Sequence, residues 1–421
     1  MNPLRPLLAC AVLLVSTACT GSSDPDQMTS SAAITIGYLA PLTGPDASAG
    51  VSARRGAEFA ATVINTAMPR LALPLAKAVG LPHLNGARIT VVTEDTGGDA
   101  QRAAGAVDTL LKKNAAALSG GYESAVTLAA SDRTEQLRVP FVNAESSATS
   151  LTQRGREWFF RTGPTDATFG RMFFSLLKQQ RAKDQPIRRL AIVHTTDRFG
   201  SDGANTIKDL LSQTDSEIVA DVPIRTSKGS LREPVRKLAA ARPDAVFALA
   251  YTEQAKSLTS AMDDLGYHPP ALLTFGAGFT SPAYLEEAGS DADGVLSRVV
   301  WSRDLAQRNP TARTVADLYE RTYKTPMDDV AARAFTAVMT IAQAIDEARS
   351  IDPDEVRTAL TGLHIPGRDT IMPWDGIYFD EEHQNLGARG AIEQFKDGRY
   401  HVVYPDDVAK SAVRWPVHRG E

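Results

Sequence analysis

The chain has 421 residues, of which 43% are hydrophobic and 23% are charged, and its formal net charge is −5. This length predicts two or three domains that each bury a core, and the composition excludes a wholly disordered chain. The mildly acidic balance argues against nucleic acid as a partner, because no excess of positive charge attracts phosphates.

Both cysteines of the chain, Cys10 and Cys19, lie near its N-terminus. The rest of the sequence therefore cannot hold a disulfide, a cysteine-ligated zinc or iron–sulfur site, or a cysteine nucleophile. Arg5 followed by the apolar run at residues 7–15 is typical of a secretory signal peptide, which we expect over residues 1–18. The apolar run is too short to cross a bilayer.

Small residues stand directly before Cys19, as in a bacterial lipobox, and we expect Cys19 to become a lipidated N-terminus. Ser16 departs from the Leu, Val or Ile usual at its place, and simple cleavage near Ala18 is the alternative. Residues 19–33 are rich in Ser, Asp and Gly, which predicts a flexible tether between the membrane and the folded body.

From residue 34 onward, short apolar runs alternate with helical periodicity. This alternation is typical of parallel sheets covered by helices, and its two series, roughly residues 34–155 and 188–280, predict an α/β fold of two lobes. The expected strands are residues 34–39, 88–93, 139–143, 189–194, 218–223 and 244–250, and the expected helices include 100–113, 124–137 and 330–349.

Two segments depart from the alternation. Residues 66–86 stand where a connection of a few residues is usual, so we expect an insertion with one short helix there. Residues 375–404 predict short strands joined by turns, with a hairpin turn at residues 396–399.

The sequence offers no anchor for catalysis. No pair among the seven histidines has the spacing of a helical metal site. The residues around Ser124 do not match the hydrolase motif Gly-x-Ser-x-Gly, and residues 276–278 lack the third glycine of a dinucleotide-binding loop. We therefore expect neither an enzyme nor a cofactor.

Small hydroxyl side chains gather instead at the predicted strand-to-helix turns. They are Thr43, Ser124 and the pair Ser146 and Ser147, which follows Glu145. In an open parallel sheet such turns lie at the carboxyl ends of the strands, where ligands bind, and hydroxyls beside free N–H groups receive an anion such as a carboxylate. The alternative is that each hydroxyl only caps its own helix.

Several segments also resemble a known family. They are ITIGYLAPLTGPDASAGVSARRGAEFA, VVTEDTGGDAQRAAGAVDTLLKK, VPFVNAESSATSLTQRG, FFRTGPTDATFG, LAIVHTTDRFGSDGA and WDGIYFD followed by GAIEQFKDGRYHVVYP. In this order, over about residues 34–405, they resemble the branched-chain amino-acid (Leu/Ile/Val) binding proteins of ABC importers. The resemblance implies a type I periplasmic binding protein, with two Rossmann-like lobes joined by three crossovers and a ligand held between them.

This resemblance implies a division of the chain and a set of ligand contacts. The first lobe would comprise residues 34–162 and 299–380, and the second lobe residues 163–298 and 381–421. Ser124 and Ser147 match hydroxyls that hold the ligand carboxylate, and Asp166 matches an aspartate that contacts the ligand ammonium in related receptors. The remaining matched positions are Tyr122 in the side-chain pocket, Glu145 and Ser146 before Ser147, and the aromatic residues Phe199 and Tyr251 of the second lobe.

Three departures leave the ligand open. Phe199 replaces a customary Tyr, and residues 275–278 lack the acid that holds the ammonium in branched-chain binders. Glu145 replaces a small residue. If its carboxylate points into the cleft, it would repel an amino-acid carboxylate and favour a cation or a polar amide; if it points to solvent, it has no such effect.

We therefore expect a monomeric, lipid-anchored receptor on the outer face of the cell membrane or in the periplasm. It would capture an amino acid or a related polar solute and deliver it to an ABC permease and its ATPase. The alternatives are a sensor that signals to a membrane partner, a binder of amide, urea-type or aromatic acid ligands, and an enzyme on the same lobes.

Overall fold

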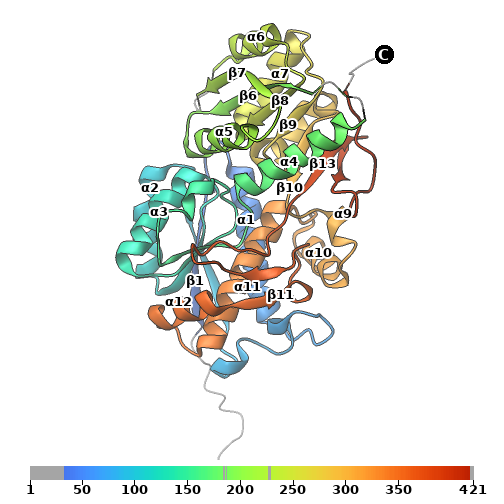
Figure 1. The fold of residues 1–421 in the computed structure, drawn as a ribbon. Helices are drawn as coiled ribbons and strands as arrows, with labels where there is room; N and C mark the ends of the chain where they lie inside the picture. Colours follow the sequence, from blue (N-terminus) through green and yellow to red (C-terminus); the bar gives the residue numbers. More distant parts are fainter. Residues whose placement is uncertain (1–32, 184, 186, 226–228, 418–421) are drawn as a thin grey trace, which may run out of the picture.

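The computed structural model describes residues 33–183, 185, 187–225 and 229–417. The expected signal peptide, Cys10, Cys19 and the tether up to residue 32 lie outside the described residues. The described chain forms two lobes, one above the other in Figure 1, and each lobe is built around its own sheet.

The first lobe contains a five-stranded sheet in the order β2-β1-β3-β4-β5, and all its pairings are parallel. Helices lie on both of its faces, as the continuous apolar strands predict. The strands are β1 (Ile34–Ala40), β2 (Ile89–Asp95), β3 (Ala115–Gly120), β4 (Phe141–Asn143) and β5 (Phe159–Arg161), and the helices are α1 (Ala47–Ile64), α2 (Ala100–Lys112) and α3 (Ser124–Leu137).

The second lobe contains a seven-stranded sheet in the order β14-β13-β10-β9-β8-β6-β7. We expected a parallel sheet, but this one is mixed, because the hairpin β13–β14 adds antiparallel to β10. The strands are β6 (Arg189–Thr195), β7 (Glu217–Ile224), β8 (Ala245–Leu249), β9 (Leu272–Thr274), β10 (Leu296–Val299), β13 (Ala391–Lys396) and β14 (Arg399–Tyr404). The helices are α4 (Asp166–Arg181), α5 (Arg198–Leu211), α6 (Arg232–Ala241), α7 (Thr252–Asp264) and α8 (Pro282–Ala288).

After β10 the chain forms α9 (Arg303–Ala306), which packs against β14 of the second lobe, and then returns to the first lobe. There it forms the helices α10 (Pro310–Tyr323), α11 (Asp329–Ala348) and α12 (Pro353–Gly362), then a small antiparallel sheet of β11 (His364–Pro366) and β12 (Gly376–Tyr378). Helix α11 lies against α1, so closely that a Cβ on Gly56 would lie 2.1 Å from the carbonyl oxygen of Ala331.

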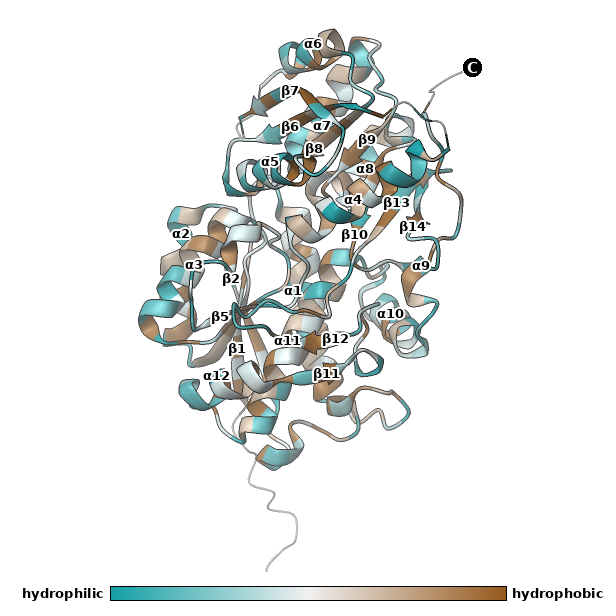
Figure 2. Ribbon diagram, viewed as in Figure 1, coloured by the Kyte–Doolittle hydropathy of each residue, from teal (hydrophilic) through white to brown (hydrophobic). Residues whose placement is uncertain are grey.

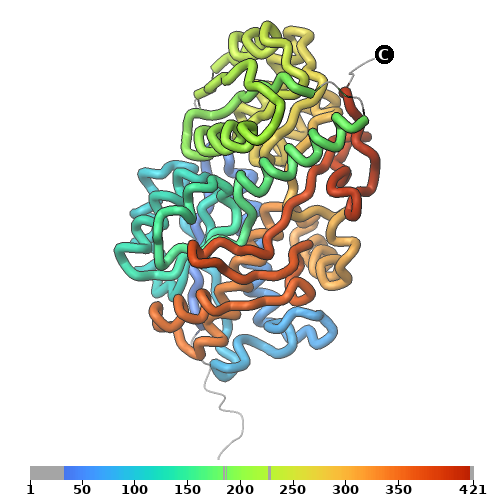
Figure 3. The backbone as a smooth tube through the Cα atoms, viewed as in Figure 1, coloured from blue at the N-terminus to red at the C-terminus, as the bar shows by residue number. Residues whose placement is uncertain are grey.

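The last passage to the second lobe comes later than residue 381, where we expected it. Residues 383–385 still run along the edge of the first sheet, where the Arg161 N–H donates to the His383 carbonyl (2.9 Å) and the Asn385 N–H to the Arg161 carbonyl (2.9 Å). In Figure 3 this red segment turns beside the first lobe before it rises to the second.

The insertion at residues 66–86 forms two 3₁₀ turns, η1 (Pro74–Ala76) and η2 (Pro82–Leu84), in place of the one short helix that we expected. Each turn begins at a proline, which has no N–H to donate and so suits the first position of a helical turn. The apolar residues Leu71, Leu73, Leu75 and Leu81 of the insertion are buried. The insertion is therefore packed into the lobe.

Apolar residues concentrate on the strands and on the inward faces of the helices, and polar residues on the outward faces (Figure 2). Strand β8 is buried along its whole length, and β6 is buried at every position after Arg189. None of the described helices is both long and apolar enough to span a bilayer.

Candidate functional site

A pocket of about 270 Å³ lies between the two lobes. All the residues predicted to contact a ligand line this pocket except Asp166, and Ala277, Arg298 and Arg333 join them. The lining consists of Tyr122, Ser124, Glu145, Ser146, Ser147, Phe199, Tyr251, Ala277, Arg298 and Arg333. Most of these residues follow the carboxyl end of a strand, where open parallel sheets bind ligands.

The turn from β3 to α3 brings Tyr122 and Ser124 to the pocket. The chain leaves β3 through Gly120, whose φ of +97° is in the region that favours glycine. A Cβ at this position would lie 2.1 Å from the carbonyl oxygen of Leu39 in β1. Ser124 is the first residue of α3, where the N–H groups of a helix lack partners within the helix. A hydroxyl and free N–H groups are therefore positioned to receive an anion.

The loop after β4 packs against this turn through Ser146. The Ser146 hydroxyl lies 2.7 Å from the Thr127 hydroxyl and 2.8 Å from the Gly121 carbonyl oxygen, so it joins the two loops that form the first-lobe wall. Ser147 is also held, because its carbonyl oxygen accepts the N–H of Asp166 at 2.7 Å.

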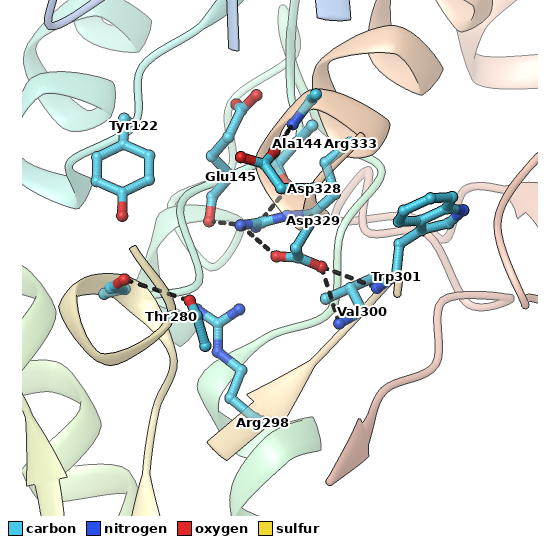
Figure 4. A network of polar contacts seen from close by, with 12 residues as sticks. Tyr122, Ala144, Glu145, Thr280, Arg298, Val300, Trp301, Asp328, Asp329 and Arg333 are labelled. Atoms are coloured by element: carbon cyan, nitrogen blue, oxygen red, sulfur yellow. Dashed lines mark hydrogen bonds and ion pairs between the residues drawn. The ribbon is translucent and has the colours of Figure 1, made fainter. Parts of the chain in front are cut away.

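Glu145 is buried, which excludes the alternative that it points to solvent. Its Oε1 accepts the hydroxyl of Tyr38 in β1 at 2.5 Å, and in Figure 4 its carboxylate points away from Arg298 while its carbonyl oxygen faces Arg333. Burial raises the pKa of this carboxyl, against the opposing effect of Arg333. The side chain therefore extends into the first lobe, and the cleft receives its backbone.

Arg333, which the sequence analysis did not identify, crosses the back of the pocket from α11. Its guanidinium donates to the carbonyl oxygens of Glu145 (2.9 Å) and Ala144 (3.2 Å) and forms an ion pair with Asp329 at 2.9 Å. Asp329 also accepts the N–H groups of Val300 (3.0 Å) and Trp301 (2.8 Å), as Figure 4 shows. This network links the pocket to the chain segment that returns from the second lobe.

The sequence analysis also missed Arg298. It lies on β10, is 4% exposed, and its guanidinium carbon lies 4.3 Å from the centre of the Phe169 ring. Burial and the nearby Arg333 lower its pKa to about 10, so it stays protonated at neutral pH. The available sequence signal was a charged residue in a short segment with apolar residues on both sides, GVLSRVVW.

Aromatic rings form the wall that faces the serines. Phe199, next to the start of α5, lies 5.3 Å from Tyr251, and Tyr251 lies 6.3 Å from Tyr122 of the other lobe, measured between ring centres. Burial raises the pKa of Tyr251 well above its usual value. Such rings suit an apolar part of a ligand.

Asp166 does not line the pocket. It begins α4, is fully buried, and lies beside α5, where a Cβ on Gly203 would be 3.5 Å from its Oδ2. Burial raises its pKa to about 6, against the opposing effects of Ser147 and Arg298. The placement of Asp166 therefore does not favour a direct contact with a ligand ammonium.

A second acidic residue, Glu123, lies between two residues of the pocket lining but is not itself part of it. Both of its carboxylate oxygens are buried without a hydrogen bond to another described residue. Burial, with Asp46 adding to the effect, raises its pKa to about 8. Among the described residues no group of acidic, histidine or cysteine side chains has the arrangement of a metal site.

A family model of periplasmic binding proteins matches residues 33–399. The chain belongs to this family. The Leu/Ile/Val-binding protein homolog 7 of Brucella abortus (strain 2308) is 25% identical to this periplasmic binding protein over 393 residues, which cover 92% of this chain and 95% of the relative.

Two solved structures share the fold, which is that of type I periplasmic binding proteins. The leucine-binding protein LivK of Thermotoga maritima MSB8 matches with a TM-score of 0.74 at 19% identity, over 89% of this chain and 99% of LivK. A solute-binding protein of an ABC transporter from Rhodopseudomonas palustris BisB5, in complex with 3,4-dihydroxybenzoic acid, matches with a TM-score of 0.71 at 17% identity, over 87% of this chain and 95% of that one.

Proposed function

We propose that this periplasmic binding protein is the extracytoplasmic receptor of an ABC importer. It captures a small carboxylate-bearing solute between its lobes, as a monomer, and delivers it to the permease and its ATPase. The observation that carries the proposal is the pocket, in which hydroxyls of the first lobe face aromatic rings of the second.

The chemistry of the two walls supports a carboxylate with an apolar body. Ser124 and the unpaired N–H groups at the start of α3 suit the carboxylate, because helix N-termini favour negative charge. Phe199 and Tyr251 suit the apolar body. Leucine and 3,4-dihydroxybenzoic acid, which the two structural relatives bind or contain, both have a carboxylate and an apolar part.

Calorimetry and thermal shift with amino acids, aromatic acids, aliphatic acids and amides test the proposal. We expect one carboxylate to bind with one-to-one stoichiometry and to raise the melting temperature. Ser124→Ala should abolish this stabilisation without changing the melting temperature of the unliganded protein, whereas Ser175→Ala, on an exposed part of α4, should change neither. Turnover of a bound compound, or stabilisation that survives in Ser124→Ala, would contradict the proposal.

The membrane anchor is a separate part of the proposal and rests on Cys19. Cys19→Ser should release the protein from the membrane fraction and prevent incorporation of labelled palmitate. Cys10→Ser is the matched control, because Cys10 would leave with the signal peptide. A protein that stays unlabelled and soluble without any substitution would show simple cleavage instead.

A further inference from the structure

The second lobe contributes a buried cation to the pocket. Arg298 lies near the carboxyl end of β10, beside the turn that follows β9. Its guanidinium comes so close to this turn that a Cβ on Gly276 would lie 3.1 Å from the guanidinium carbon. Residues 275–278, which contain no acid, therefore border a guanidinium.

The charge of Arg298 is not matched by a direct partner. Its Nε is buried without a hydrogen-bond acceptor, and its guanidinium forms no ion pair with a carboxylate of the described chain. Its contact is the face of the Phe169 ring, which attracts a cation far less than a carboxylate does. Arg333 differs, because Asp329 neutralises it at 2.9 Å.

Two backbone acceptors that could hold a ligand ammonium at the back of the pocket are already engaged. The carbonyl oxygens of Ala144 and Glu145 accept hydrogen bonds from Arg333, so a cation of the protein occupies that position. The lining includes one carboxylate, that of Glu145, and it bonds to Tyr38 and points away from Arg298 (Figure 4). An ammonium in this pocket would meet the guanidinium of Arg298, which no carboxylate pairs among the described residues.

We infer that Arg298 binds an anionic or strongly hydrogen-bond-accepting group of the ligand, and that the pocket takes small organic acids without an ammonium group. The inference rests on the proposed function, since it names the substrate class of the same pocket. A buried charge without a partner destabilises the protein, and an anion offsets this effect only if it reaches the guanidinium.

Matched ligand pairs test the substrate class by calorimetry. The pairs are leucine with 2-oxo-4-methylpentanoate and phenylalanine with 3-phenylpropanoate. In at least one pair we expect the acid without an amino group to bind and its partner to bind at least about tenfold more weakly, because the ammonium of the amino acid faces the guanidinium of Arg298.

Substitutions test the role of Arg298 itself. Arg298→Gln should weaken binding of the acid about 30-fold or more, and Arg298→Lys should weaken it less, because Lys keeps the charge but loses the fork of donors. Arg236→Gln, on the exposed surface of α6, is the matched control and should leave the affinity unchanged. The melting temperature without ligand shows whether each variant folds.

The Glu145→Gln variant tests whether the Glu145 carboxylate holds a ligand ammonium or bonds only to Tyr38. If Glu145 held an ammonium through its free Oε2, the variant would lose an amino-acid ligand; we expect it to retain the affinity for the organic acid.

Binding of leucine or phenylalanine but of no deaminated partner would overturn the inference and leave the proposed function standing. Unchanged affinity in Arg298→Gln would also overturn it. Binding of no carboxylate at all would overturn both.

Discussion

The carboxylate of Asp46, just before α1 of the first lobe, accepts hydrogen bonds from Thr252 at the start of α7 in the second lobe. The Thr252 hydroxyl lies 3.1 Å from Oδ1 of Asp46, and the Thr252 amide nitrogen lies 3.5 Å from the same oxygen. Asp46 stands at the N-cap position of α1 but does not cap that helix with its side chain. It joins the two lobes instead. A movement that separates the lobes, here called opening, would therefore break this bond.

Thr252→Val should therefore weaken ligand binding by about tenfold, since it removes the hydroxyl donor and leaves a buried acceptor less satisfied. Thr259→Val, which removes a buried hydroxyl from the same helix but on the side facing Tyr284, is a matched control for the loss of a hydroxyl. Calorimetry with a ligand found in the screen measures both. Equal affinities of the Thr252→Val variant and the unmodified protein would show that this bond does not favour closure.

The same bond predicts a pH dependence of binding. Burial raises the pKa of Asp46 to about 6 in the closed form, and opening would return it towards its ordinary value of 3.8. The closed form then binds more protons, so its advantage is complete below the ordinary value and is lost as pH rises through about 6. Affinity should fall between pH 5 and 7. Asp46→Asn keeps an acceptor without a charge and should flatten this profile.

Glu123 predicts a pH dependence of folding stability. Its pKa is raised in the folded protein from the usual 4.5 to about 8, mainly by burial. The folded state thus binds a proton that the unfolded state releases, and this contribution is lost as pH rises through about 8, with a slope of at most about 1.4 kcal/mol per pH unit. Thermal unfolding from pH 5 to 9 measures it. Glu123→Gln should be more stable than the unmodified protein at pH 8 and have a flatter profile.

Exposed Glu286→Gln on α8 is the control for the Glu123 prediction, because it removes a carboxyl from the surface. Two other buried acids, Asp46 and Asp166, each with a pKa raised to about 6, contribute in the same direction at lower pH. A Glu123→Gln variant whose stability falls with pH as steeply as that of the unmodified protein between pH 7 and 9 would contradict the prediction.

Two glycine-to-alanine substitutions in helices should have opposite effects. Gly56→Ala places a Cβ 2.1 Å from the Ala331 carbonyl oxygen and should force α1 and α11 apart, at a cost of about 1–3 kcal/mol or more. Gly105→Ala, on the exposed face of α2, meets no atom within 4 Å and should stabilise the protein by about 0.5–1 kcal/mol. Urea unfolding compares them, and equal effects would exclude close helix packing as the cause.

The insertion at residues 66–86 should contribute stability and not ligand affinity. Leu81 is 0% exposed, so Leu81→Ala should cost about 2–5 kcal/mol in the free energy of unfolding. Val79, two residues earlier, is 40% exposed, and Val79→Ala should cost about 0.5 kcal/mol or less. Neither should change ligand affinity at a temperature where both variants are folded. A loss of affinity in Leu81→Ala would assign the insertion a role in binding.

The elements with strong periodicity could be predicted from the sequence. Helix α2 lies within a residue of its expected bounds, because its buried residues Ala103, Val107 and Leu110 recur at helical spacing. Strands β6 and β8 also lie within a residue of theirs, because their apolar runs are continuous. Strand β3 was not predicted. Its sequence AAALSG is poor in β-branched and aromatic residues, and it is a strand because it pairs with β1 and β4 on either side. Such pairing depends on strands that lie elsewhere in the sequence, so the residues of β3 alone do not predict it.

The residues of the candidate site likewise fall into those that the sequence could predict and those that it could not. Ser124, Ser146 and Ser147 could be predicted because each lies at a turn after a strand, and the resemblance supported them. Arg333 could not, since it meets the backbone of Glu145 across 188 residues of sequence. Only the folded chain shows that these two residues touch.

The bonds of Asp329 affect how the ligand specificity of this pocket can be changed. One carboxylate holds Arg333 and also the two N–H groups of Val300 and Trp301, where the chain returns to the first lobe. A substitution at position 333 would therefore disturb the crossing between the lobes together with the pocket. Arg298 makes no bond to Asp329 among the described contacts, so a substitution at 298 would change the charge of the pocket and leave these bonds at the crossing in place.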